Sequence, residues 1–179
     1  MTEKEIINFW FNELESKDWY KKDDSLDKLI KDRFLDIYHQ AYKGELWQWR
    51  ETVEGRLAEI IILDQFSRNM FRDHADAFKY DYLAVALAQE ASLLSQTQSL
   101  EPKKRAFMYM PLMHSESAKI HELAVKIFST EGLENSLKFE LKHKAIIDRF
   151  NRYPHRNKVL GRESSPEELE FLQGPDSSF

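Results

Sequence analysis

The sequence of 179 residues contains no cysteine. This absence excludes disulfide-stabilised scaffolds, metal sites built on thiolates and catalysis by a thiol nucleophile. Glycine is scarce, with five residues in the whole chain. No segment alternates between apolar and polar side chains over the length of a strand. These absences argue against a β-protein, because turns between strands usually need glycine.

Two further absences limit the partners and the location of the protein. The N-terminal segment lacks the basic stretch followed by an apolar stretch that marks a signal peptide, and no apolar run is long enough to span a bilayer. The net charge of -5 argues against a broad nucleic-acid-binding surface, which usually carries a dominant basic stripe. We therefore expect a cytoplasmic protein that binds neither membranes nor nucleic acid. The sequence leaves its oligomeric state open.

A helical pattern continues along the chain. The composition, with 42% hydrophobic and 13% aromatic residues, is that of an ordinary globular protein. The length suits one domain over residues 1–179, with 170–179 as a peripheral tail. Thr2 and Glu5 form a capping box for a first helix, and Ser25 and Gly44 are expected to bound a second. We predict an all-α fold.

Apolar side chains at helical spacing predict the later helices as well. The segment 57–66 is apolar on most of its circumference, which places it centrally in the bundle. Pro111 is expected to kink or end its helix, and Pro154 to stop another. The predicted helices cover 81–94, the residues from Pro102, 120–128, 133–152 and 166–172.

Arginines gather in two segments, 64–72 and 148–163. Both segments carry the pattern Asp-x-Phe-x-Arg behind an apolar helix, as LDQFSRNMFR and IDRFNRYPHRN. They contain six of the ten arginines but one of the sixteen lysines, and their seven cations face three acids, an excess of four positive charges. The planar fork of arginine binds carboxylate or phosphate through two hydrogen bonds and tolerates partial burial better than lysine does. The two segments therefore predict an anion site.

A structural role for the same arginines stays open. Cations near a helix C-terminus complement the macrodipole, and an aspartate four residues earlier is placed for an ordinary intrahelical ion pair. The aspartate itself opposes the dipole and needs a cation. We predict that Asp64 meets Arg149 or Arg152. Asp148 would then meet Arg68, so that the two motifs exchange partners. Three arginines would remain unpaired as an anion-binding rim: Arg72, Arg156 and Arg162.

Titratable side chains at two helix breaks extend the candidate site. His114, Ser115 and Glu116 follow Pro111, and we expect His114 and Glu116 to face the arginines as acid or base. His155 follows the second helix stop, where it is a candidate acid or base or a C-terminal cap. Residues 114 and 116 do not share a helical face, which argues against a metal site. No metal or cofactor is expected, because standard phosphate-loop, zinc-protease and serine-hydrolase motifs do not occur.

The chain resembles the bacterial DUF924 family in four ordered segments: LAEIIILDQFSRNMFR, AFKYDYLAVALA, RAFMYMPLMHSES and IIDRFNRYPHRNKVLGRESSPEELEFL. The resemblance runs from about Leu57 to the end and implies a TPR-like bundle of antiparallel helix pairs. The family is named for having no assigned function, so the resemblance supplies no reaction. Ser67 stands where the resemblance implies proline. The matching polar positions are Asp64, Gln65, Arg68, Asn69, Arg72, His114, Ser115, Glu116, Arg152, His155, Arg156, Asn157, Gly161, Arg162 and Glu163.

Two functions remain open. The first is a binding module, in which a groove between helix pairs holds an anionic small molecule or a peptide carboxylate. Its candidate ligand-binding residues are Asp64, Arg68, Asn69, Arg72, Ser115, Arg152, Arg156, Asn157 and Arg162. The second is an enzyme that acts on an anionic metabolite. In that case His114 or His155 transfers a proton with help from Glu116, and three arginines clamp an oxyanion: Arg68, Arg152 and Arg156.

Overall fold

The computed structural model describes residues 1–175 and 177, and no strand occurs within them. The predicted all-α fold is confirmed. The first part of the chain forms α1 (Glu3–Asn8), η1 (Phe9–Glu13), α2 (Asp24–Tyr42), η2 (Trp47–Glu51), α3 (Val53–Ile60), η3 (Ile61–Phe66) and α4 (Ser67–Met70). The second part forms η4 (Ala75–Ala77), α5 (Asp81–Ser92), η5 (Ser95–Ser99), α6 (Pro102–Met113), α7 (Ala118–Phe128), α8 (Glu134–Phe150), η6 (Pro154–Arg156) and α9 (Pro166–Phe171). The segments η1 and η3 are π-helical, and the other η segments are 3₁₀ turns.

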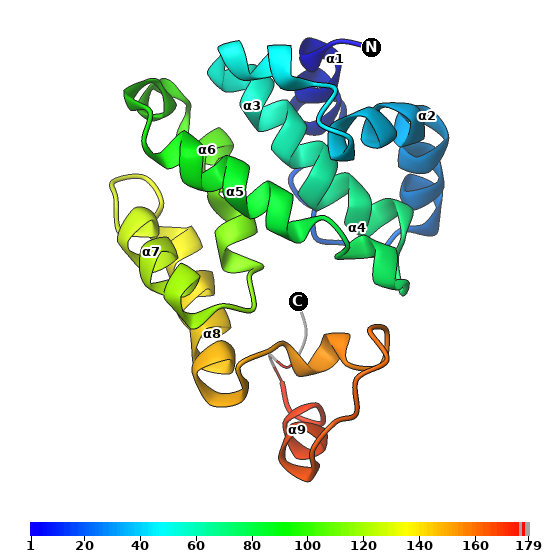
Figure 1. Cartoon of the computed structure of the whole chain (residues 1–179), viewed down its shortest axis with the longest axis vertical. Coiled ribbons are helices and arrows are strands. Elements are labelled where there is room, and N and C mark those ends of the chain that lie inside the picture. Colours follow the sequence, from blue (N-terminus) through cyan, green and yellow to red (C-terminus); the bar gives the residue numbers. More distant parts are fainter. Residues whose placement is uncertain (176, 178–179) are drawn as a thin grey trace.

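The helices pack largely on their neighbours in the sequence. At one end, α1 packs on α3, and α2 packs on η3 and α4. From there α5 contacts α6, α6 contacts α7, and α7 contacts α8 (Figure 1). This succession is compatible with the TPR-like stacking of helix pairs. The C-terminal segment with η6 and α9 lies at the end of the molecule opposite α1 (Figure 1).

The segment predicted to be central is buried as expected. The helices α3, η3 and α4 follow one another without a break, and the residues at their junctions keep right-handed helical backbone angles. Phe66 of the first Asp-x-Phe-x-Arg motif is fully buried, and its ring lies 4.7 Å from Phe34 and 5.8 Å from Phe9. Burying a phenylalanine side chain stabilises a fold by roughly 1.5–3 kcal/mol. This anchor in the aromatic core fixes the orientation of the turn that carries Asp64.

Most helix ends follow the predicted signals. Both hydrogen bonds of the capping box at Thr2 and Glu5 are present, and Gly44 adopts a φ of 75° after α2. The N-cap of α2 is Asp23, so the prediction of Ser25 was wrong. The carboxylate of Asp23 accepts hydrogen bonds from the main-chain N–H of Ser25 and of the next residue, at 3.0 and 3.1 Å. A carboxylate also complements the helix dipole at this end, which a hydroxyl does not.

Two proline predictions need correction. Helix α6 continues through Pro111 to Met113. Because Pro111 lies in the last turn, its missing N–H removes a hydrogen bond only near the end of the helix. Helix α8 ends at Phe150, ahead of Pro154, since Asn151 adopts a left-handed conformation with a φ of 54°. Asparagine tolerates this conformation better than most residues.

Two further expectations concern the chain as a whole. The predicted peripheral tail, residues 170–179, falls partly outside the described residues. Among the residues that are described, no helix has both the length and the apolar character needed to cross a membrane.

Candidate functional site

The π-helical turn η3 places Asp64 beside the end of α6. Asp64 is 1% exposed, and its two carboxylate oxygens lie 2.8 and 3.0 Å from Nδ1 of His114. Gln65 donates a second hydrogen bond, of 2.5 Å, from its amide nitrogen to Asp64. Single π turns inside longer helices are frequent at functional sites. We call Asp64, Arg68, Asp81, His114 and Arg156 the Arg–His cluster.

The protonation states of Asp64 and His114 follow from their surroundings. Burial opposes ionisation of Asp64, but Arg68, His114 and Gln65 outweigh it and hold the pKa of Asp64 below its usual range. Burial lowers the pKa of His114, and Arg68 and Arg156 add to this effect against the attraction of Asp64. His114 is therefore neutral near pH 7 and donates Nδ1–H to Asp64. Its Nε2 keeps a lone pair and has no hydrogen-bond partner among the described residues.

Arg68 donates hydrogen bonds to acceptors from two elements. Its Nη1 and Nη2 donate to the carboxylate of Asp81, at the start of α5, over 3.0 and 2.9 Å. Nη1 also lies 3.1 Å from the Asp64 carboxylate and donates 2.7 Å to the Asp64 main-chain carbonyl. The hydroxyl of Ser67 donates to the same carbonyl over 3.2 Å. Arg68 thus fixes η3 to α5.

Arg156 is buried without a matching set of acceptors. The residue is 6% exposed, and its guanidinium carbon lies 4.6 Å from the ring centroids of both Phe78 and Tyr153. Within the described residues, its hydrogen bonding is limited to Nη1 and Asp81, at 3.5 Å. Nε is buried and has no partner. Burial lowers the pKa of Arg156, and Arg68 adds to this effect against Asp81. The edge formed by Nε and Nη2 is therefore without an acceptor.

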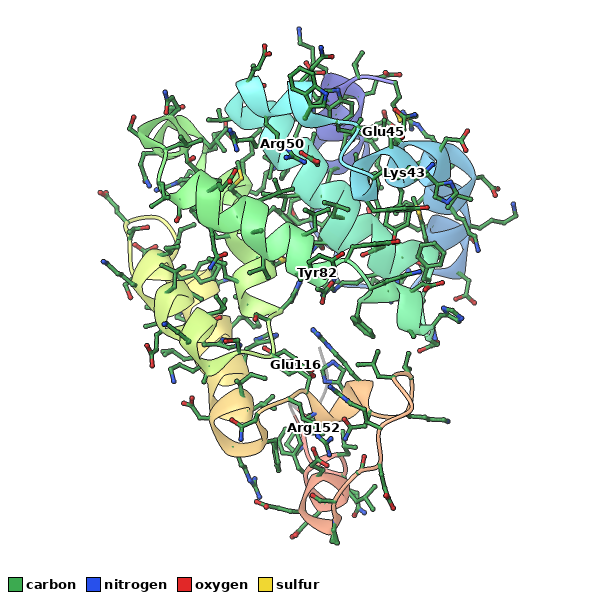
Figure 2. The ribbon with its side chains drawn as sticks, in the orientation of Figure 1. Lys43, Glu45, Arg50, Tyr82, Glu116 and Arg152 are labelled. Atoms are coloured by element: carbon green, nitrogen blue, oxygen red, sulfur yellow. The ribbon has the colours of Figure 1, made fainter. Side chains whose placement is uncertain are left out.

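Glu116 ties the C-terminal segment to the bundle. Its carboxylate accepts a hydrogen bond of 2.7 Å from the main-chain N–H of Tyr153 and two, of 2.6 and 2.9 Å, from Arg162. Burial opposes ionisation, but Arg162 and the Tyr153 N–H hold the pKa of Glu116 below its usual value. Figure 2 shows Glu116 between α6 and α7, on the side that faces the C-terminal segment. Glu116 thus positions Tyr153 and, three residues on, Arg156.

Replacing Glu116 by glutamine should loosen the segment 151–163. Loss of the charged acceptor leaves Arg162 without its carboxylate partner, and we expect the free energy of unfolding to fall by about 1–3 kcal/mol. Amide hydrogen exchange of residues 151–163 should accelerate more than that of α5. The matched control is Glu122→Gln on the exposed surface of α7, which should leave both measurements unchanged. Equal exchange in the two variants would contradict the anchoring role.

A layer of histidines surrounds Tyr153 next to the Arg–His cluster. The Tyr153 ring lies 5.5 Å from His155, 5.8 Å from His143 and 6.4 Å from His121. Burial lowers the pKa of His143 to about 3 and that of His155 to about 4. Both are therefore neutral near pH 7. Nowhere in residues 1–175 and 177 do three His, Asp or Glu side chains gather in a set suited to a metal ion.

His121 and Glu140 form a fully buried pair in the same layer. Nδ1 of His121 lies 2.7 Å from Glu140, and Nε2 lies 2.9 Å from the main-chain carbonyl of Ser115. A carbonyl only accepts, so Nε2 carries a proton. The Nδ1 contact then contains one further proton, on either partner. Burial raises the pKa of Glu140 against the effect of His121, which favours the proton on the carboxyl group.

Several predicted ligand-binding residues lie outside the cluster. Asn69 and Arg72 both donate to Asp27 of α2, at 2.8 Å from Asn69 and 2.5 and 2.8 Å from Arg72. Arg152 donates to Glu168 of α9 over 2.6 and 2.7 Å. These three side chains fasten neighbouring helices to the motifs.

Two more predicted residues stabilise turns. Asn157 donates to the hydroxyl of Ser164 over 3.0 Å and accepts a hydrogen bond of 3.0 Å from Arg162. The hydroxyl of Ser115 accepts the main-chain N–H of Ser117 at 3.2 Å, next to the start of α7. Ser115 therefore stabilises the turn before α7, whose N-cap is Ser117.

The predicted exchange of partners between the two motifs was wrong. Asp64 pairs with Arg68 of its own motif, while Asp148 pairs with Lys144 at 2.7 Å. Arg149 pairs with Glu167 at 2.8 Å. The physical reason is the different exposure of the two aspartates: the Asp148 side chain is 51% exposed, so that water compensates its unfavourable position at the helix end.

The predicted rim of unpaired arginines was also wrong in part. Arg72 and Arg162 have carboxylate partners, and Arg156 alone has a weak one. The local excess of positive charge is met by acids from other parts of the chain. These partners are Asp27, Asp81, Glu116, Glu167 and Glu168.

Three residues that contact Arg68 or Arg156 were not among the sequence candidates. Phe78 and Asp81 lie in AFKYDYLAVALA, a segment that carries the family resemblance. Tyr153 precedes Pro154 and reads in sequence as an ordinary apolar position. The position of Asp81 at the start of a helix is where an acid is favourable, which was a signal in the sequence. Its pairing with distant arginines arises only when the helices dock. The local sequence pattern does not predict how the helices dock.

The two best-defined surface hollows lie away from the Arg–His cluster. One is lined by residues of α1, η1 and α3 and by Thr52. The other lies between η5, the start of α6 and the turn after α7, and includes Arg105 and Gly132. The cluster itself is mostly buried: its most exposed side chain, Arg68, is 20% exposed, and His114 is 16% exposed.

The geometry defines the class of protein as a helical bundle with a buried arginine, aspartate and histidine cluster between its body and its C-terminal segment. The chain belongs to DUF924, a family of bacterial proteins of unknown function, whose family model matches residues 6–176. It is similar to a solved structure of a protein of unknown function, ATU0120, from Agrobacterium tumefaciens. The two share 34% identity with a TM-score of 0.87, over 96% of this chain and 97% of the other. No curated protein matches the chain significantly.

Proposed function

We propose that this protein binds a small oxyanion, a carboxylate or a phosphoryl group, at the Arg–His cluster. The observation that carries the proposal is the guanidinium of Arg156, which is buried while its Nε–Nη2 edge has no acceptor. A buried donor without a partner costs about 1–3 kcal/mol, and more when it is charged. Two oxygens of a ligand would satisfy this edge through a pair of parallel hydrogen bonds.

The neighbouring groups limit the kind of ligand. Phe78 and Tyr153 lie against the Arg156 guanidinium, so the ligand approaches through the remaining edge. The lone pair on Nε2 of His114 accepts a hydrogen bond from a ligand hydroxyl or N–H. A small molecule that carries both an oxyanion and a hydroxyl or amide offers a partner to each of these groups. The burial of Arg156 favours a compact anion over a long peptide.

Thermal unfolding in a series of anions tests this proposal. Phosphate, succinate and malate should raise the melting temperature more than chloride does at equal ionic strength, because only a ligand bound to the native state stabilises it by mass action. A ligand at 100 times its Kd stabilises by about 2.7 kcal/mol. A peptide ending in a free carboxylate, compared with its amidated form, separates peptide binding from small-molecule binding. Identical shifts for all anions would indicate screening alone.

The variant Arg156→Lys tests the residue that carries the proposal. Lysine keeps the charge but removes the two-donor edge, so we expect at least a tenfold loss of affinity for the stabilising anion. This corresponds to about 1.4 kcal/mol. Arg149→Lys is the matched control, because Arg149 is half-exposed and pairs with Glu167. Titration calorimetry at one ionic strength should show a normal Kd for the control. Equal affinities in the two variants would place the anion elsewhere.

A further inference from the structure

We infer that His114 is a general base, positioned by Asp64, that activates water to hydrolyse an ester of the anion held by Arg156. The inference rests on the proposed function for the binding of the substrate. It adds a reaction to that binding. The geometry that carries it is the contact of 2.8 Å between Nδ1 of His114 and Asp64, with Nε2 unpartnered among the described residues.

Asp64 is built to hold the imidazole in one orientation. Its carboxylate is 1% exposed and is surrounded by His114, Arg68 and the amide of Gln65. A buried carboxylate on Nδ1–H fixes the tautomer that leaves the lone pair on Nε2, and it stabilises the imidazolium that forms when Nε2 takes a proton. Asp64 is thus a positioning residue, and His114 is the group that meets the substrate.

Water is the nucleophile that this arrangement allows. No hydroxyl or amino group of the described residues forms a hydrogen bond with Nε2 of His114. The hydroxyl of Ser115, the next residue, is engaged in the turn before α7. Within the described part of the chain the base therefore has no protein nucleophile to activate, and the sequence contains no cysteine to supply one.

The chemical step balances with water as the second reactant. Nε2 of His114 accepts a proton from water while the water oxygen forms a bond to the carbonyl carbon, and the π electron pair moves to the carbonyl oxygen. The positive field of Arg68 and Arg156 favours this oxyanion. When the carbonyl forms again, the bond from carbon to the leaving oxygen breaks and the alcohol takes the proton from Nε2. The products are an acid and an alcohol, and His114 is neutral again.

The strength of the base selects the class of substrate. Burial and the two nearby arginines weaken the basicity of His114, so that it stays neutral but is a modest base. A modest base that activates water suits a reactive carbonyl such as an activated ester. An amide is less reactive and has a poorer leaving group, so its hydrolysis needs stronger acid–base catalysis. The substrate class is therefore an ester with a second, free oxyanion that binds Arg156.

Hydrolysis of 4-nitrophenyl hemisuccinate, compared with 4-nitrophenyl acetate, tests the inference. The wild type should prefer the anionic ester by at least about tenfold in kcat/KM, the effect of one good interaction. His114→Gln should lower kcat by about 100-fold or more while the Kd of succinate stays within about threefold of the wild type. His74→Gln, at an exposed histidine, should leave kcat unchanged. The kcat/KM of the wild type should rise with pH to a plateau, with a midpoint below about pH 6.5, the ordinary histidine pKa.

The outcomes separate the reaction from the binding. Succinate binding without hydrolysis of the hemisuccinate above the buffer rate would overturn the inference and leave the proposed function intact. Hydrolysis that survives in His114→Gln would overturn it in the same way. Asp64→Asn adds a readout specific to positioning, because it should move the pH at which kcat/KM reaches half its plateau. If succinate, malate and phosphate all fail to bind, both proposals fall.

Discussion

Replacing Asp64 by asparagine is expected to lower the free energy of unfolding by about 3–5 kcal/mol, the usual result of breaking one partner out of a buried ion pair. The substitution keeps the size of the side chain and removes its charge. Arg68 then loses one of its two carboxylates, and the Nδ1–H of His114 faces a neutral amide. Because Asp64 is 1% exposed, water cannot replace the lost charge. Urea unfolding near pH 7 measures the change.

The second Asp-x-Phe-x-Arg motif provides the matched control. Asp148→Asn changes the same residue in the same local pattern, but the side chain is 51% exposed and pairs with Lys144 one turn earlier. An exposed pair of this kind contributes about 0.3–0.5 kcal/mol. The two variants should therefore differ by several kcal/mol. Similar losses in both would show that burial around Asp64 does not control its contribution.

This contrast between the two motifs shows what the local sequence pattern can and cannot predict. The all-α fold, the central position of 57–66 and the choice of Asp64, Arg68, His114 and Arg156 follow from periodicity, residue type and family resemblance. The two motifs share the same Asp-x-Phe-x-Arg pattern, yet one lies in a buried π turn and the other at an exposed helix end. Which motif is buried depends on the docking of α5 and α6 against η3. No window of neighbouring residues contains that information.

For the same reason, the acidic partners of the arginines could not be predicted from the sequence. Asp81 lies 13 residues after Arg68 and 75 before Arg156. The excess of positive charge counted within the two segments is therefore compensated, in the folded protein, by acids from other segments. The π turn is also a tertiary effect, since the sequence ILDQF has ordinary helical periodicity. The substitution at Ser67, where the resemblance implies proline, is explained by its hydroxyl, which donates to the Asp64 carbonyl.

Acidification from about pH 7.5 to about pH 5 is expected to destabilise the protein by several kcal/mol, with about 2 kcal/mol from His143 alone. The folded pKa of His143 is about 3 and that of His155 about 4, whereas an unfolded histidine has a pKa of about 6.5. Below about pH 6.5 the unfolded state therefore binds more protons than the folded state. Stability is full above this pH and falls as the pH drops toward the folded values. The contribution of half-buried His155 is smaller, because solvent screens it.

The environment of His143 explains why its neutral form is held. Burial is the main cause of the low pKa of His143, and repulsion from His114, His121 and Arg156 acts against its protonation in the same direction. The hydrogen bond from Nδ1 to the Phe139 carbonyl works in the opposite direction. Glu140 opposes the acid effect elsewhere in the layer. Its raised pKa means that the folded state binds a proton more readily than the unfolded state. This contribution therefore stabilises the folded state as the pH falls.

His143→Gln tests the origin of this acid sensitivity. Glutamine does not titrate, so the difference in unfolding free energy between about pH 7.5 and about pH 5 should shrink by about 2 kcal/mol, whatever the variant loses in absolute stability. His74→Gln removes an exposed histidine and should leave the difference as in the wild type. Urea midpoints at both pH values give the four free energies needed. An unchanged difference in His143→Gln would mean that other groups cause the acid sensitivity, since a histidine with the same pKa in the folded and unfolded states cannot contribute to it.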